Sequence, residues 1–252
     1  MAISLDARYE NFAVGDSPLL SALTGLSTFS ISLWAKVDST TKDHDFCIWG
    51  PHSATTGGWL FWRDDSGGAF GRTDMVAGLV DNDLRIETVN SSWNDTNWHH
   101  ACLTVQLGSA TGFNAYIDAV NRNYNRNSLA GYAALTGAGA GVPVRFGDST
   151  PASSSSWMLG DLDDIRIYNR VLTPTEIQTI YNRRGTDDII NGLLVRYLLQ
   201  DAAPGTDLTG ASDEVRDSGP GGYDATANDP SAVTYPTYVA SAVLSGLRRR
   251  AA

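Results

Sequence analysis

The chain has 252 residues, of which 42% are hydrophobic, and its formal net charge at pH 7 is −10. A chain of this length can bury one large core, and a single all-β sandwich commonly reaches this size. The acidic balance argues against a broad nucleic-acid surface, which needs clustered positive charge to replace counterions. No apolar run approaches the roughly 20 residues of a membrane-spanning helix. We therefore expect neither a nucleic acid nor a membrane as partner.

Short alternating segments dominate the chain and predict β-strands. In Thr28–Val37 the apolar residues Phe29 and Ile31 share one face of the predicted strand, while Ser30 and Ser32 lie on the other. Similar segments predict further strands at Phe46–Gly50, Gly58–Asp64, Leu84–Val89, Val142–Gly147 and Leu193–Leu199. The 25 glycines of the chain suit the turns that join the strands of a sandwich.

The segment Gly160–Tyr181 changes from a strand pattern to a helix pattern. Its first half alternates between polar residues and the isoleucines Ile165 and Ile167, as a half-buried strand does. Its second half has the spacing of a capping box, TPTE, which begins at Thr173 and has Pro174 in the first helical position. The sequence therefore predicts a strand followed by one short surface helix, and this is the only helix that we predict.

The amino-acid sequence of this segment resembles the closing signature of laminin-G-like, concanavalin-A-type jelly-roll domains. Trp98–Val105, Phe113–Asp118 and Ile3–Val14 are similar to two core strands and the opening strand of that family. The resemblance implies an all-β fold, an antiparallel two-sheet jelly-roll sandwich with one short surface helix. Ala119 stands where the family usually has glycine after Asp118. Because alanine disfavours positive φ, we expect the turn there to be longer or differently shaped.

The segment Gly192–Thr226 resembles the lead-in that this family usually places before its opening strand. It either begins a truncated second repeat, or the domain is in effect circularly permuted and Leu193–Leu199 pairs back onto the first sheet. The second alternative is favoured, since a hairpin-sized fragment does not stabilise itself. We expect a single domain over residues 1–235, with residues 190–235 supplying the lead-in strands, and an arm or tail over residues 236–252.

The resemblance also implies a candidate Ca²⁺ site, because members of the family hold this ion, which takes six to eight oxygen ligands. Asp163 matches the aspartate of the closing signature, and Asp6 matches an acidic position of the opening strand. A Ca²⁺ ion shared between these two strands is one interpretation. In the other, favoured interpretation, Asp163 accepts backbone hydrogen bonds in a bulge, and Asp164 pairs with Arg166 or Arg170.

Catalytic residues are not expected. Some jelly-roll relatives are glucanases with two carboxylates, which retaining chemistry needs about 5 Å apart. Asp164-Ile165-Arg166 does not offer the acidic arrangement of those enzymes. His99 and His100 are adjacent on a predicted strand, so their side chains face opposite ways.

Carbohydrate binding is the other function that the resemblance implies. It needs aromatic faces beside amide and carboxylate groups in surface loops. The candidate residues for contact with a carbohydrate or a protein partner are Trp93, Asn94 and Asp95 in one loop and Trp157 in another. The alternative for both tryptophans is that they cover the ends of the core or fill protein contacts.

The chain begins without the basic and apolar segments of a signal peptide. We therefore expect a protein that is made in a host cytoplasm and located in the virion of a tailed phage. Our main hypothesis is a non-catalytic capsid decoration (cement) protein that binds neighbouring capsid subunits and forms a homo-oligomer. The alternative is a carbohydrate-binding adhesin module of a tail fibre or cell surface, with a glycan as partner.

Overall fold

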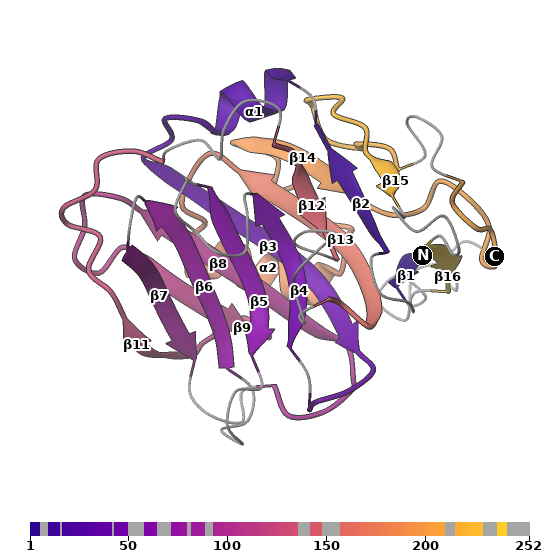
Figure 1. The fold of residues 1–252 in the computed structure, drawn as a ribbon, viewed down its shortest axis with the longest axis horizontal. Coiled ribbons are helices and arrows are strands. Elements are labelled where there is room, and N and C mark those ends of the chain that lie inside the picture. The colour runs from indigo at the N-terminus through magenta and orange to yellow at the C-terminus, as the bar shows by residue number, and fades with distance from the viewer. Residues whose placement is uncertain are drawn as a thin grey trace.

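The computed structural model describes residues 1–5, 10–15, 17–41, 43–49, 58–64, 72–79, 82–88, 93–135, 142–147, 157–209, 215–228 and 236–240. In these ranges the chain forms two antiparallel sheets that are stacked face to face (Figure 1). Neither of the helices in the described ranges is long and apolar enough to cross a membrane. The predicted all-β, two-sheet jelly-roll sandwich is confirmed.

Each sheet has eight strands. The first, sheet A, contains in spatial order β10 (Val120–Asn121), β9 (Phe113–Ile117), β8 (His99–Gln106), β3 (Thr28–Val37), β13 (Gly160–Tyr168), β1 (Ala2–Leu5) and β16 (Thr237–Val239), while β14 (Leu193–Tyr197) also pairs with β13. The second, sheet B, contains β11 (Asn123–Arg126), β7 (Asn82–Thr88), β6 (Arg72–Leu79), β5 (Trp59–Asp64), β4 (His44–Trp49), β12 (Val144–Phe146), β2 (Asn11–Val14) and β15 (Thr226–Asn228).

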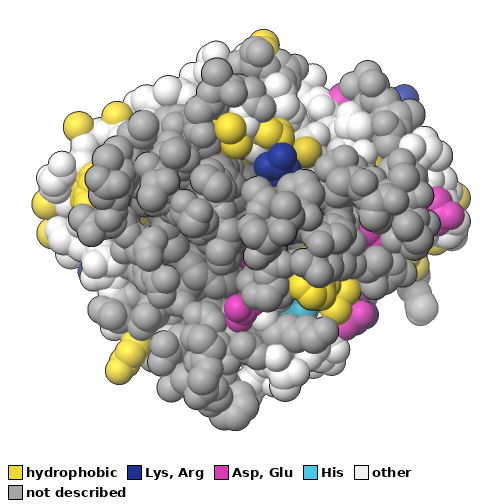
Figure 2. Space-filling model, in the orientation of Figure 1, with side chains coloured by type: hydrophobic (Ala, Val, Ile, Leu, Met, Phe, Trp, Pro, Cys, Tyr) yellow, Lys and Arg dark blue, Asp and Glu magenta, His cyan; other side chains and the backbone are white. Residues whose placement is uncertain are grey.

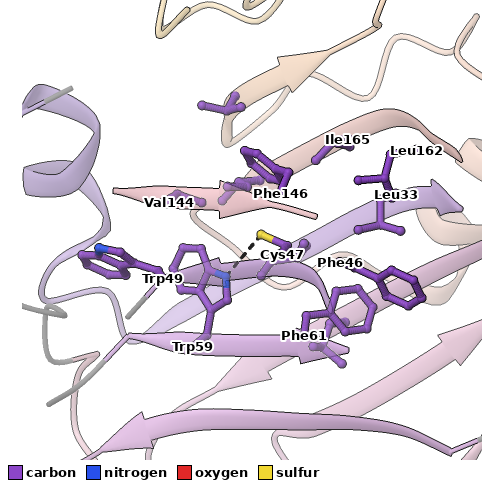
Figure 3. Close-up of a cluster of buried hydrophobic side chains, with 14 of the residues drawn as sticks. Leu33, Phe46, Cys47, Trp49, Trp59, Phe61, Val144, Phe146, Leu162 and Ile165 are labelled. Atoms are coloured by element: carbon purple, nitrogen blue, oxygen red, sulfur yellow. Dashed lines mark hydrogen bonds between the residues drawn. The ribbon is translucent and has the colours of Figure 1, made fainter. Parts of the chain in front are cut away.

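The main core lies between the two sheets, where aromatic side chains of sheet B face aliphatic side chains of sheet A (Figure 3). Phe46 and Phe61 meet edge to face with ring centroids 5.7 Å apart, an arrangement that aromatic pairs prefer. The Nε1–H of Trp59 donates a hydrogen bond to the sulfur of Cys47 at 3.4 Å. Burial raises the pKa of the Cys47 thiol to about 12, so this thiol is neutral and acts as a core residue.

The strand and helix predicted for Gly160–Tyr181 are both present. Ile165 and Ile167 of β13 are buried in the core. Helix α2 (Pro174–Arg183) begins with the predicted capping box, in which Thr173 and Glu176 satisfy each other's backbone N–H groups. The helix packs on the outer face of sheet A through a second buried cluster, formed by Cys102, Tyr116, Tyr168, Leu172, Ile177, Ile180 and Leu193.

The opening segment differs from its prediction as one strand over Ile3–Val14. It forms two strands in different sheets, because β1 pairs with β13 in sheet A while β2 pairs with β12 in sheet B. A second helix, α1 (Ser17–Leu23), follows and contributes Leu19 and Leu23 to one end of the core. This helix was not predicted, and with seven residues it is too short to show a clear helical periodicity.

The turn after Asp118 is also not as expected. Asp118 and Ala119 both adopt positive φ, 52° and 63°, and Val120 pairs directly with Ile117. This is the two-residue hairpin turn that glycine normally permits, so the expectation of a longer or different turn was wrong. Hydrogen bonds that the Asp118 carboxylate accepts from His99 and from the His100 backbone N–H hold the turn in place despite the alanine.

The C-terminal segments return to the sheets of the N-terminal strands. Strand β14 pairs with β13, as the favoured alternative for Leu193–Leu199 requires. Strand β15 pairs with β2, and β16 pairs with β1. The start of the expected arm is therefore part of sheet A, because Tyr238 of β16 is buried in the core. Residues 241–252 lie outside the described ranges.

Candidate functional site

The candidate loop that contains Trp93, Asn94 and Asp95 leads into the first residue of β8. The ring of Trp93 is fully buried. It stacks on Phe46 of sheet B at a centroid distance of 5.2 Å and lies 5.0 Å from the ring of His99 of sheet A. The expectation that Trp93 offers its face to a ligand was therefore wrong, and the alternative, in which it covers the end of the core, describes its position.

The polar residues of this loop stay at the surface. Asn94 is exposed, and Asp95 is partly exposed. The Asp95 Oδ1 atom accepts the backbone N–H of Asn97 at 2.7 Å and lies 3.0 Å from Nε2 of His99. The loop thus presents amide and carboxylate groups above a buried tryptophan.

His99 connects this loop to the turn between β9 and β10. Its Nδ1 atom lies 2.7 Å from Oδ2 of Asp118, whose Oδ1 atom accepts the backbone N–H of His100 at 3.0 Å. We call Asp95, His99 and Asp118 the His99 cluster. Because each ring nitrogen faces a carboxylate, the protonated imidazolium donates to both sides.

The electrostatics of the His99 cluster agree with this geometry. Burial by itself would lower the pKa of His99, but hydrogen bonds and charges from Asp118 and Asp95 outweigh it and raise that pKa. The Asn97 backbone N–H and His99 lower the pKa of Asp95. For Asp118 burial opposes the change, yet hydrogen bonds from His99 and His100 still lower its pKa. The two carboxylates therefore favour the protonated form of His99.

Trp157 belongs to another segment, which leads into β13. Its side chain is half-buried, and the next residue, Met158, donates its backbone N–H to the Gly147 oxygen at 2.7 Å. Residues 148–156, the serine-rich run before it, lie outside the described ranges. The prediction that Trp157 contacts a carbohydrate or a partner stays a prediction.

Asp163 and Asp164 belong to a buried network instead of an open site. The Asp163 carboxylate accepts the backbone N–H of Asp164 at 2.8 Å, within a register shift between β13 and β3. Arg166 binds Asp164 through two nitrogens, at 2.9 and 2.6 Å, and also binds Asp187. Arg196 donates to Asp164 from β14 at 3.1 Å. These contacts are the ones that the structural interpretation of the motif requires.

The described residues around Asp163 do not form a ligand set for the predicted Ca²⁺ ion. Asp6 lies outside the described ranges, and Asp163 is fully buried. Within the described part of the chain no three His, Cys, Asp or Glu side chains are grouped so as to hold a metal ion. A Ca²⁺ ion shared by Asp6 and Asp163 therefore stays a prediction.

The roles of His99 and Asp118 were not predicted from the sequence: His99 contacts Asp95 through one ring nitrogen and Asp118 through the other. Their relationship follows from the pairing of β8 with β9, in which Ala101 lies opposite Ile117. In the lower half of the face drawn in Figure 2, a histidine and hydrophobic side chains are visible, with acidic side chains on either side.

The two-sheet jelly roll with a polar loop edge defines a lectin-like β-sandwich protein. Residues 9–178 match the family described as the concanavalin A-like lectin/glucanases superfamily. Since this match covers more than half of the chain, the protein belongs to that family. A search of curated proteins found no match.

Solved structures with the same fold include proteins with diverse sequences. A Bacteroides ovatus ATCC 8483 protein, provisionally described as carbohydrate binding, aligns with a TM-score of 0.64 and 14% identity over 95% of this chain and 60% of its own. This chain thus spans about 60% of that protein's length. At this identity, the similarity shows the fold alone.

Two further structures align over most of their own length. The heptameric SAP-like pentraxin of Limulus polyphemus has a TM-score of 0.52 and 12% identity over 71% of this chain and 81% of its own. The CBM40 of the Ruminococcus gnavus IT-sialidase, bound to α2,3-sialyllactose, has a TM-score of 0.52 and 9% identity over 71% of this chain and 96% of its own.

Proposed function

We propose that this protein is a non-catalytic carbohydrate-binding module. The observation that supports this most strongly is the similarity to the Ruminococcus gnavus CBM40, which this fold matches over 96% of that module's length. Membership of a lectin/glucanase superfamily supports the same function. None of the similarities favours a capsid decoration protein, a virion location or a capsid partner. The alternative stated in the sequence analysis therefore becomes the main proposal.

The loop edge at Asn94 and Asp95 is the candidate contact surface. Amide and carboxylate groups can donate and accept hydrogen bonds to sugar hydroxyls. The Asp95 carboxylate is held by His99 and by the Asn97 backbone N–H, and Trp93 packs beneath the loop on Phe46. A surface that is already ordered loses less side-chain entropy when it binds a ligand.

An array of neutral and sialylated oligosaccharides tests this proposal on the full chain. We expect specific, saturable binding that Asp95→Asn and Asn94→Ala each weaken by about tenfold, the effect of losing about 1.4 kcal/mol. Asn182→Ala provides the matched control, since Asn182 is an exposed asparagine on α2. Absence of binding to any oligosaccharide at millimolar concentration would refute the proposal.

A further inference from the structure

The corner between β10 and β11 displays an aromatic side chain that the candidate loop does not use. Strand β10 belongs to sheet A and β11 to sheet B, so the chain crosses between the sheets at Arg122. Among the described residues the exposed large hydrophobic side chains are Tyr124 at 69%, Ile190 at 65% and Val120 at 48%. Val120 belongs to β10 and Tyr124 to β11, which is labelled at the lower left of Figure 1.

Tyr124 lies at an irregularity of the strand pairing. Asn123 pairs with Thr88 and Asn125 pairs with Glu87, so Tyr124 has no residue opposite it on β7. A bulge of this kind inserts one residue and re-aims its side chain. Tyr124 is therefore directed away from the ladder, which explains its high exposure.

The backbone on both sides of Tyr124 is fixed by side-chain hydrogen bonds. Asn123 accepts the backbone N–H of Ala115 at 2.8 Å and donates from Nδ2 to Asn114 at 2.8 Å. Arg126 donates from Nη1 to the Phe113 oxygen at 3.2 Å and to Oδ1 of Asn114 at 2.9 Å. These bonds tie β11 to β9, so the aromatic ring projects from a rigid base.

Two exposed asparagines lie within three residues of Tyr124 along the chain. Asn121 and Asn127 are both exposed, and they lie on either side of Tyr124 along the chain. Oδ1 of Asn121 accepts the backbone N–H of Asn123 at 3.2 Å, which orients its Nδ2 group as a donor. An exposed aromatic face and exposed amide groups in the same segment suit a pyranose, whose C–H face is apolar and whose rim carries hydroxyls. The net charge of −10 favours a neutral sugar over an anionic one.

We propose that Tyr124 is a stacking platform for a neutral pyranose, with Asn121 and Asn127 as hydrogen-bonding partners for its hydroxyls. This inference rests on the proposed carbohydrate-binding function and assigns it a contact surface outside the loop at Asn94 and Asp95. The bulge accounts for the exposure of the ring. The hydrogen bonds from Asn123 and Arg126 to Asn114 hold the backbone on both sides of it.

The test is an NMR titration of the full chain with lactose, maltose and N,N′-diacetylchitobiose, alongside the oligosaccharide array. We expect Tyr124→Ala to weaken binding by about tenfold or more, whereas Tyr124→Phe keeps the ring and retains binding within about threefold. Ile190→Ala removes an equally exposed hydrophobic side chain elsewhere and leaves binding unchanged. Because Tyr124 is exposed, Tyr124→Ala should unfold at the same temperature as the wild type.

The outcomes separate this inference from the proposed function. If the wild type binds a neutral sugar and Tyr124→Ala binds it equally well, Tyr124 does not stack on the sugar. The proposed carbohydrate-binding function is then still supported. If the wild type binds only sialylated oligosaccharides, the proposal that the ligand is a neutral pyranose is wrong. If it binds no oligosaccharide, both proposals fail.

Discussion

The adjacent residues His99 and His100 occupy opposite electrostatic environments on the two faces of β8. His99 lies between two carboxylates, which favour its charged form and raise its pKa. His100 is fully buried and lies 2.8 Å from the Ser32 hydroxyl. Burial lowers the pKa of His100 to about 4, with the positive charge of Arg166 acting in the same direction. One histidine therefore favours folding when protonated and the other when neutral.

The two histidines give the free energy of unfolding opposite pH dependences. Between about pH 6.5 and 4 the unfolded chain binds a proton at His100 that the folded chain does not, so stability falls as the pH falls. The pKa of His99 is raised, so its contribution is full below about pH 6.5 and is lost as the pH rises through the folded pKa.

Urea unfolding between about pH 5 and pH 8 measures both effects. We predict that His100→Gln reduces the loss of stability on the acidic side, where the slope per histidine is at most about 1.4 kcal/mol per pH unit. His99→Gln should reduce the loss on the alkaline side. Parallel curves for the wild type and both variants would contradict this assignment.

Ala119 carries a conformational cost that glycine would remove. An L-residue with a side chain pays roughly 1 kcal/mol or more in the left-handed region. Its half-buried methyl group packs against the cluster under α2, which offsets part of that cost. We predict that Ala119→Gly raises the free energy of unfolding by about 0.5 kcal/mol. The control is Asp118→Gly, which should lower stability because it also removes the hydrogen bonds to His99 and His100.

Among the secondary-structure elements, α2 shows why some helices can be predicted from the sequence alone. Its start is encoded within four consecutive residues, so Thr173 and Glu176 could be recognised without knowing the fold. The helix then covers sheet A, where Tyr181 stacks on Trp34 at 5.6 Å and Arg184 lies 5.5 Å above the same ring. Because α2 packs on the outer face of sheet A, the polar face of β3, with Ser30 and Ser32, is buried.

Elements that depend on distant partners could not be predicted in the same way. The segment Ile3–Val14 has one continuous pattern, but its two halves pair with β13 and β12, which lie far along the chain. The candidate site follows the same rule. The surface position of Asn94 was evident from its polar neighbours, whereas the burial of Trp93 depends on Phe46 in the other sheet.

The capping box of α2 predicts a defined loss of stability. Oγ1 of Thr173 accepts the N–H of Glu176 at 3.2 Å, and Oε2 of Glu176 accepts the N–H of Thr173 at 2.8 Å. We predict that Thr173→Ala lowers the free energy of unfolding by about 1 kcal/mol. Thr175→Ala, an exposed change in the same helix, should be neutral or slightly stabilising, since alanine has the higher helix propensity. Equal losses in both variants would rule out the cap as the cause.

For the whole molecule, Trp93 joins the two sheets at one end of the core. Its ring contacts Phe46 of sheet B and His99 of sheet A. We predict that Trp93→Ala lowers the free energy of unfolding by about 3–5 kcal/mol, as removal of a buried aromatic does. Asn94→Ala, in the same loop, should stay within about 0.5 kcal/mol of the wild type. If Trp93→Ala were equally mild in chemical denaturation, the tryptophan would not be part of the core.

The pairing of β1 with β13 and β16 affects the order in which the chain can fold during translation. Both partners of β1 are made at the far end of the chain, at Gly160–Tyr168 and Thr237–Val239. At about 5–20 residues per second, a ribosome needs roughly 10–30 seconds to reach the first of them. Until then the nascent β1 has neither neighbour and is open to chaperones. Strand β1 thus gains both of its neighbours in sheet A only after Thr237–Val239 has been made.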